Sequence, residues 1–156
     1  MSDVSERVRQ LENRDHMQIK IETGGKRMTE DPHPHPSSER LIYCCSGASN
    51  VGILSFQAAI RLAQEGFGAF SCIAGIGSRN PPMIRKAKSA GERVVIDGCP
   101  IGCARKIMEM CQIPVDRYVI VTELTIDKTH DLDIENSDIE SVVKEVKRAN
   151  RSTGEK

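Results

Sequence analysis

Apolar residues follow two periodicities along the chain, and both patterns begin near residue 41. Runs of consecutive apolar, β-branched residues predict buried strands, whereas apolar residues spaced three or four positions apart predict helices with one buried face. The expected strands span 41–44, 68–73, 94–96 and 117–122. The expected helices span 51–64, 81–90, 100–111 and 138–149. Because strands alternate with helices, we expect a three-layer, Rossmann-like α/β domain whose four-stranded, mainly parallel sheet has a strand order such as 2-1-3-4.

Turn residues mark the boundaries of these elements. A polar turn over 46–50 offers an N-cap for the first helix, and Pro81 fits the first turn of the second. Gly75 and Gly77 are expected in the loop between the second strand and that helix. Pro100 needs no backbone N–H partner, so the third helix is expected to begin there, directly after the third strand.

Length and composition limit the classes of function. A chain of 156 residues is long enough for one domain with a substantial core and too short for two ordinary ones. Lys plus Arg and Asp plus Glu number 22 each, so no overall charge favours nucleic acid or an anionic membrane as a partner. The absence of a long apolar run and of an apolar secretory leader predicts a cytoplasmic protein. Its six cysteines are then kept reduced, so metal binding or thiol chemistry explains them better than disulfides.

The composition changes along the chain and divides it into three parts. Residues 1–40 are polar and contain a Pro-His-Pro-His-Pro run, so we expect a flexible N-terminal extension. Residues 41–150 are the expected α/β domain, and residues 151–156 are expected to be a disordered tail. The four histidines are interpreted as solvated polar residues rather than metal ligands: His16, His33, His35 and His130.

Four of the six cysteines fall at the carboxyl ends of the expected strands. Cys45 follows the first strand, Cys72 ends the second, and Cys99 follows the third. Cys103 lies about one helical turn beyond Cys99, on the same side. Because neighbouring parallel strands are about 4.8 Å apart and ligands bind beyond their carboxyl ends, we expect these four thiols to converge. Two cysteines separated by three residues also have a spacing that is common among zinc ligands.

Packing is the better explanation for the other two cysteines. Cys44 directly precedes Cys45 in an extended strand, so the two side chains point to opposite sides and only one of them belongs to the site. We assign Cys45, because it is nearer the turn. Cys111 comes eight residues after Cys103, about 12 Å along the helix, and is too far from a site at the start of that helix.

Three segments of the sequence together resemble one known family. They are CSGASNVG at 45–52, CIAGIGSR at 72–79 and DGCPIGCARK at 97–106. In this combination the sequence resembles the DGC-domain family, which is regarded as zinc-binding and takes its name from the tripeptide that is Asp97-Gly98-Cys99 here. The resemblance covers about residues 41–149 and implies a metal held by four cysteines, which map onto Cys45, Cys72, Cys99 and Cys103. It implies little about a biochemical activity.

Thiolate ligands restrict the choice of metal. Four thiolates without carboxylate or imidazole form a closed, soft site that suits zinc or, alternatively, an iron–sulfur cluster. The turn glycines Gly47, Gly75 and Gly98 are expected to let the backbone approach the cofactor and aim N–H groups at the sulfurs. Asp97 is expected to act beside them as a turn or hydrogen-bonding residue. The sequence therefore predicts a metal-binding protein, in metal handling or sensing, whose partners are the metal ion and an unidentified protein.

A cysteine-dependent enzyme is the alternative that the same residues leave open. The Gly-rich turn after Cys45 precedes a helix N-terminus, where an anion could bind, and a low-pKa cysteine beside Asp97 could be the nucleophile of a sulfur-transfer or redox reaction. However, the sequence contains no P-loop, no complete dinucleotide fingerprint and no histidine near a cysteine that would serve as a base. We therefore assign no catalytic residues.

Overall fold

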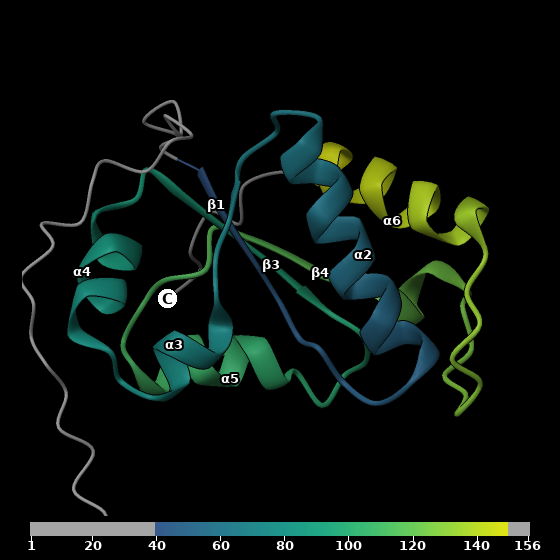
Figure 1. Ribbon diagram of the computed structural model, residues 1–156, viewed down its shortest axis with the longest axis horizontal. Coiled ribbons are helices and arrows are strands. Elements are labelled where there is room, and N and C mark those ends of the chain that lie inside the picture. The colour runs from purple at the N-terminus through teal and green to yellow at the C-terminus, as the bar shows by residue number, and fades with distance from the viewer. Residues whose placement is uncertain (1–39, 150–156) are drawn as a thin grey trace, which may run out of the picture. The chain divides into compact units, whose positions relative to one another are not determined.

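The computed structural model describes residues 40–149, and Figure 1 shows them in colour. The strands are β1 (Arg40–Cys44), β2 (Ala69–Phe70), β3 (Glu92–Asp97) and β4 (Arg117–Ile120). The helices are α2 (Asn50–Gln64), α3 (Ile73–Gly77), α4 (Pro81–Ser89), α5 (Cys103–Met110) and α6 (Asn136–Arg148), with a short 3-10 helix, η1, at Val121–Leu124. The expected N-terminal extension, apart from Arg40, and the expected tail lie outside the described residues.

The four strands form one parallel sheet, with β1 and β3 in the middle and β2 and β4 at the edges. The order β2-β1-β3-β4 is the one predicted from the sequence. Ile42 pairs with Val94, and Val95 pairs with Tyr118, so apolar positions of adjacent strands lie side by side. A strand that is buried on both faces has a continuous apolar sequence, which is why these strands could be recognised.

Helices cover both faces of this sheet. Figure 1 shows α2 and α6 together on one side of the strands and α3, α4 and α5 on the other. Because successive strand residues point to opposite faces, Ile42 and Cys44 pack under α2 and α6, whereas Leu41 and Tyr43 pack under the other three helices. The predicted three-layer α/β fold is thereby confirmed. Among residues 40–149, no helix combines the length and the apolar character that are needed to cross a membrane.

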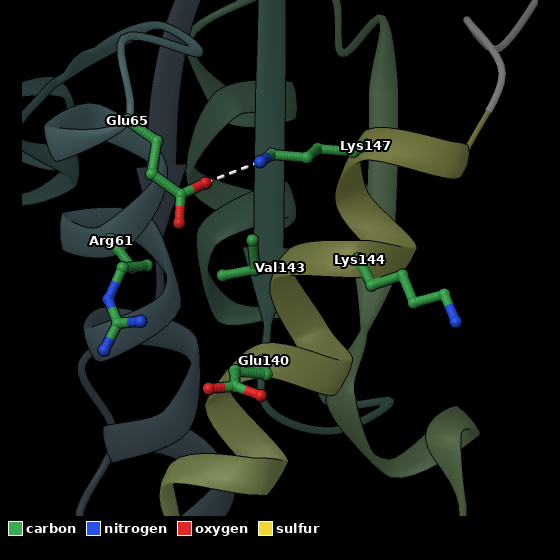
Figure 2. Close-up of a pocket in the computed structure, with 6 residues that line it drawn as sticks. All are labelled: Arg61, Glu65, Glu140, Val143, Lys144 and Lys147. Carbon is green, nitrogen blue, oxygen red and sulfur yellow. Dashed lines mark hydrogen bonds and ion pairs between the residues drawn. The ribbon is translucent and has the colours of Figure 1, made fainter.

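The outer surface where α2 meets α6 is lined mainly by charged side chains, as Figure 2 shows. Lys147 Nζ lies 2.5 Å from Glu65 Oε2, and this ion pair joins the two helices. Both side chains are exposed, however, and pairs of this kind contribute little to stability. Val143 is buried between the helices, and such apolar burial stabilises their contact more than an exposed ion pair does.

The third helix begins later than the sequence predicted. We expected it to start at Pro100, but α5 starts at Cys103. Residues 98–102 form a turn in which the N–H of Gly102 donates to the carbonyl of Cys99 at 3.1 Å. Gly102 has a φ of 66°, and a residue in this left-handed conformation cannot be part of an α-helix. Cys99 therefore lies in a turn, and Cys103 is the first residue of the helix.

The second strand is shorter than predicted. It ends at Phe70, and Cys72 occupies the N-cap position of α3. Gly75 and Gly77 belong to this short helix, so the loop that we predicted for them is wrong. Tertiary packing requires a glycine in this helix, because a Cβ atom on Gly75 would lie only 2.0 Å from the sulfur of Met83 in α4. The fourth strand also ends early, at Ile120, where η1 begins.

Ion pairs hold the amino ends of the strands together. Glu92 of β3, which is 1% exposed, accepts hydrogen bonds from Arg40 of β1 at 2.5 Å and from Arg117 of β4 at 2.9 Å. Burial opposes the charge on Glu92, but the two guanidinium groups hold its pKa below the usual value. Arg117 also donates to carbonyl groups at the end of α6, those of Val146, Lys147 and Ala149. This network fixes three strands and one helix relative to one another.

Candidate metal centre

A surface cavity of about 390 Å³ lies beyond the carboxyl ends of β1 and β3. Three of the four predicted ligands line it: Cys45 after β1, Cys99 after β3, and Cys103 at the start of α5. The loop that precedes α6 contributes Lys128 and His130 to the wall. Among the described residues that line this cavity, none is an aspartate or a glutamate. The donor side chains in this wall are thus thiols, serine hydroxyls and the nitrogen groups of Lys128 and His130.

Cys44 and Cys45 point to opposite faces of the sheet, as the strand alternation predicted. Cys44 is 2% exposed in the apolar core beneath α2, and burial raises its pKa to about 12. Cys45 lies on the other side, where its sulfur accepts a hydrogen bond from the N–H of Gly98 at 3.0 Å and lies 3.4 Å from the hydroxyl of Ser55. Burial also raises the pKa of Cys45, and the hydrogen bonds from Ser55 and Gly98 work against this rise.

Gly98 has the role that we expected of a turn glycine, because its N–H points at a cysteine sulfur. A Cβ atom at this position would lie 2.8 Å from the backbone carbonyl of Val51. Only glycine lets the turn after β3 pass so close to the first turn of α2. The backbone of Gly47 also forms a hydrogen bond that works against the rise in the pKa of Cys45. A Cβ atom on Gly47, however, would meet nothing closer than the Cα of Gly52 at 3.9 Å, so the space there does not require glycine. A Cβ atom on Gly75 would meet the side chain of Met83.

Asp97 stabilises the start of α5. Its carboxylate, which is almost fully buried, accepts hydrogen bonds from the N–H groups of Ala104 at 2.9 Å and Arg105 at 3.0 Å. These are first-turn N–H groups, which have no partner within the helix itself. The hydroxyl of Tyr118 donates to the same carboxylate at 3.2 Å. Asp97 thus fixes the helix start that carries Cys103, and it does not itself line the cavity.

The loop that precedes α6 is attached to the first residue of α2. The side chain of Asn50 donates to the carbonyl of Asp127 at 2.8 Å and accepts from the N–H of Thr129 at 2.8 Å. These bonds bring Lys128 and His130 to the cavity, where Lys128 Nζ lies 3.6 Å from the sulfur of Cys99.

Neither residue was expected at the site. His130, which we interpreted as a solvated polar residue, lines the same cavity as three of the cysteines. The contact joins parts of the chain that are almost 80 residues apart in sequence, and no local pattern indicates it.

Besides Cys44, two cysteines lie outside the wall of this cavity. Cys72 is exposed at the N-cap of α3 and does not line the cavity, although the next residue, Ile73, does. Cys111 ends α5, and its thiol contacts the carbonyl of Ile76 at 3.4 Å. Within residues 40–149, no three side chains of His, Cys, Asp or Glu are arranged so that they could hold a metal ion. The cavity thiols would therefore have to turn toward one another to share an ion.

The fold and the cavity define a class of protein: a three-layer α/β domain that carries several thiols beyond the carboxyl edge of its sheet. The family model of the DGC domain matches residues 41–146, and the chain belongs to this family. The predicted family resemblance is thus confirmed. The chain is also 32% identical over 123 residues to the "Anaerobic and virulence modulator AnvM" of Pseudomonas aeruginosa, a match that covers 79% of this chain and 89% of that protein. No solved structure matches it.

Proposed function

We propose that this protein binds a thiophilic metal ion, zinc in the first place, at the carboxyl edge of its sheet and acts in metal handling or sensing. The observation that carries the proposal is the cavity with Cys45, Cys99 and Cys103 in its wall. Membership of the DGC family, with its suggested role in metal binding, supports it. Cys72, one residue from the cavity-lining Ile73, is the fourth ligand that the sequence indicates.

The groups around the thiols suit a soft cation. Thiolate and imidazole favour zinc or an iron–sulfur cluster, whereas calcium and magnesium prefer oxygen ligands, and no carboxylate of the described residues lines the cavity. Bound thiolates carry negative charge that the protein has to balance. The N–H of Gly98 at the sulfur of Cys45 and the ammonium group of Lys128 near the sulfur of Cys99 supply partial and full positive charge there.

Exposure of the site favours handling or sensing over a purely structural role. Cys103 is exposed and Cys99 is only half-buried, so a bound ion would be accessible to a partner or a competing ligand. A structural zinc site is usually closed. The relative AnvM is named an anaerobic and virulence modulator, and a thiol-based site whose state depends on oxidants fits a role of this kind.

A cysteine-dependent redox or sulfur-transfer enzyme is the second candidate, and one contact favours it. The ammonium group of Lys128 near the sulfur of Cys99 would stabilise a thiolate, and His130 in the same cavity would be available as a base. The two candidates differ in the state of the thiols. An enzyme needs at least one free thiolate, whereas a metal site protects its ligands from alkylation.

The test is metal analysis of the full chain, purified anaerobically under reducing conditions. We expect about one zinc ion per chain, or an iron–sulfur cluster if the protein shows visible absorption that reduction bleaches. Cys45→Ser, Cys99→Ser and Cys103→Ser should each lose the metal. The matched controls Cys44→Ala and Cys111→Ser remove thiols outside the cavity and should keep it. A metal-free protein in which the cavity thiols react freely with a thiol reagent would overturn the proposal.

A further inference from the structure

Charge is distributed unevenly over the domain, although the chain as a whole is neutral. Residues 66–91 contain four basic residues and no acidic one, whereas residues 123–140 contain seven acidic residues and one basic residue, Lys128. The two segments lie in different layers, because α4 packs on the face of the sheet opposite to α6. Figure 1 shows α4 at one side of the domain and the loop before α6 at the other. The neutral sum therefore conceals two oppositely charged surfaces.

The basic surface lies on the layer that contains α4 and α5. We define it by five exposed side chains: Arg79, Arg85, Lys86, Lys88 and Lys106. No ion pair joins any of them to another residue of the described part of the chain. Arg105, in contrast, pairs with Glu109 at 2.8 Å on the same layer. The five positive charges are thus not compensated within residues 40–149, and they are available to a negatively charged partner.

The acidic surface is the segment 123–140, which includes the loop before α6 and the first turn of that helix. Six of its seven acidic side chains are exposed, and Asp138 is half-buried. None of the seven forms an ion pair with another residue of 40–149. The side chain of Asn50 donates to the carbonyl of Asp127 and accepts from the N–H of Thr129, so part of this segment is attached to α2. The loop therefore presents its negative charges from an anchored backbone.

Each surface also carries an exposed, large apolar side chain. Leu132, which is 57% exposed, lies between Asp131 and Asp133. Met110, which is 68% exposed, follows Lys106 by one turn of α5. A combination of apolar contacts and a polar rim is typical of protein–protein interfaces. The two surfaces thus offer opposite charges and an apolar contact to one another.

We propose that the basic surface of one copy of this chain binds the acidic surface of a second copy. A nucleic acid would match the basic surface alone, whereas a second copy matches both surfaces through charge complementarity. Because the two surfaces lie at opposite sides of the domain, the contact is head to tail, and such contacts form rings or open chains. The inference goes beyond the proposed metal binding and does not depend on it.

The experiment is sedimentation velocity of the full, reduced chain over a range of protein concentrations at two salt concentrations. Salt at about 0.1 M and about 1 M gives Debye lengths of about 10 Å and about 3 Å, so attraction between exposed charges is largely screened in the second buffer. At low salt we expect a mass above that of the monomer, which rises with protein concentration. At high salt the association should weaken by more than about tenfold.

Two double variants test which surfaces meet. Arg85→Glu with Lys86→Glu reverses charge on the basic surface, and Asp131→Lys with Asp133→Lys reverses it on the acidic surface. Each variant alone should be monomeric at low salt, because surfaces of like charge then face one another. An equimolar mixture of the two should associate again, since each pair of surfaces regains opposite charges. This recovery also shows that both variants are folded.

The matched control is Arg61→Glu with Lys144→Glu, which changes the net charge as much as the first variant does. Both residues lie on the outer surface where α2 meets α6 (Figure 2), and this variant should still associate. An unmodified chain that stays monomeric at low salt would overturn the proposal, as would a mixture of the two double variants that stays monomeric. A monomeric chain that binds a single-stranded oligonucleotide through Arg85 and Lys86 would assign the basic surface to nucleic acid instead.

Discussion

The two ends of the sheet use polar groups in opposite ways. At the amino end, Glu92 is buried and binds two arginines, and Arg117 also closes the end of α6. These groups satisfy one another within the fold. At the carboxyl end, the polar groups are thiols that border a cavity open to solvent, and several of them are half-buried or exposed. These thiols are therefore accessible to a ligand.

The comparison indicates which residues serve stability and which serve function. A buried ion pair that loses one partner leaves an uncompensated charge, so changes at the amino end should destabilise the fold. A half-exposed thiol at the carboxyl end can be replaced at little cost in packing, so changes there should remove a ligand and leave the fold intact.

Replacement of Glu92 should have the largest effect on stability. Glu92→Gln removes the charge that compensates buried Arg117, and we expect a loss of about 3–5 kcal/mol in the free energy of unfolding. Urea denaturation at neutral pH measures it. Glu65→Gln is the matched control, because the ion pair of Glu65 with Lys147 is exposed and should contribute less than about 1 kcal/mol. Equal losses in the two variants would contradict the division.

Gly98→Ala should combine a loss of stability with a loss of metal binding. The new methyl group would lie 2.8 Å from the backbone of Val51, so the turn has to shift, at a cost of about 1–3 kcal/mol. The shift also moves the N–H that donates to the sulfur of Cys45. Gly47→Ala is the control, since its methyl group would meet only open space and ordinary contacts. Unfolding and metal content should both distinguish the two variants, and identical behaviour would refute this account of Gly98.

The stability that Glu92 provides should depend on pH. Its pKa is lowered in the folded protein, so its contribution is complete above the ordinary glutamate pKa of about 4.3 and is lost as the pH falls through the lower folded value. The difference in unfolding free energy between the unmodified protein and Glu92→Gln should therefore shrink below about pH 4. Urea titrations at a series of pH values measure it, and a difference that grows in acid would have the wrong sign.

Lys128→Met should have the smallest effect. The ammonium group lies near the sulfur of Cys99 on an exposed loop, and exposed charge pairs contribute about 0–1 kcal/mol. We therefore expect the apparent zinc affinity to fall by at most about fivefold, measured by competition with a chelator. Lys144→Met, on the outer side of α6, should leave the affinity unchanged. A complete loss of zinc in Lys128→Met would show that this lysine does more than balance charge.

Much of the fold could be predicted because its signals are local. Val94, Val95 and Ile96 form a continuous apolar run, and a glycine follows the end of the strand that contains it. This combination is typical of a strand that is buried on both faces. The strand order followed from the same alternation of strands and helices. We misplaced the start of α5, which depends on a left-handed glycine, and the whole of α3, in which a glycine packs against a methionine from another helix. Such contacts have no counterpart in a local pattern.

The candidate site could be predicted only in part for the same reason. Cys45, Cys99 and Cys103 were placed correctly at one edge, since the ends of adjacent parallel strands must meet there. The contribution of His130 and Lys128 was missed, because it depends on hydrogen bonds from Asn50 to a loop that is distant in sequence. A histidine in a polar loop is expected to be solvated, and only the fold shows that this loop borders the cavity.

X-ray absorption at the metal edge of the purified, reduced protein tests most directly whether thiols at the carboxyl edge of the sheet bind the metal. We predict a zinc spectrum dominated by sulfur at about 2.3 Å. A shell of oxygen and nitrogen without sulfur would show that these thiols do not bind it.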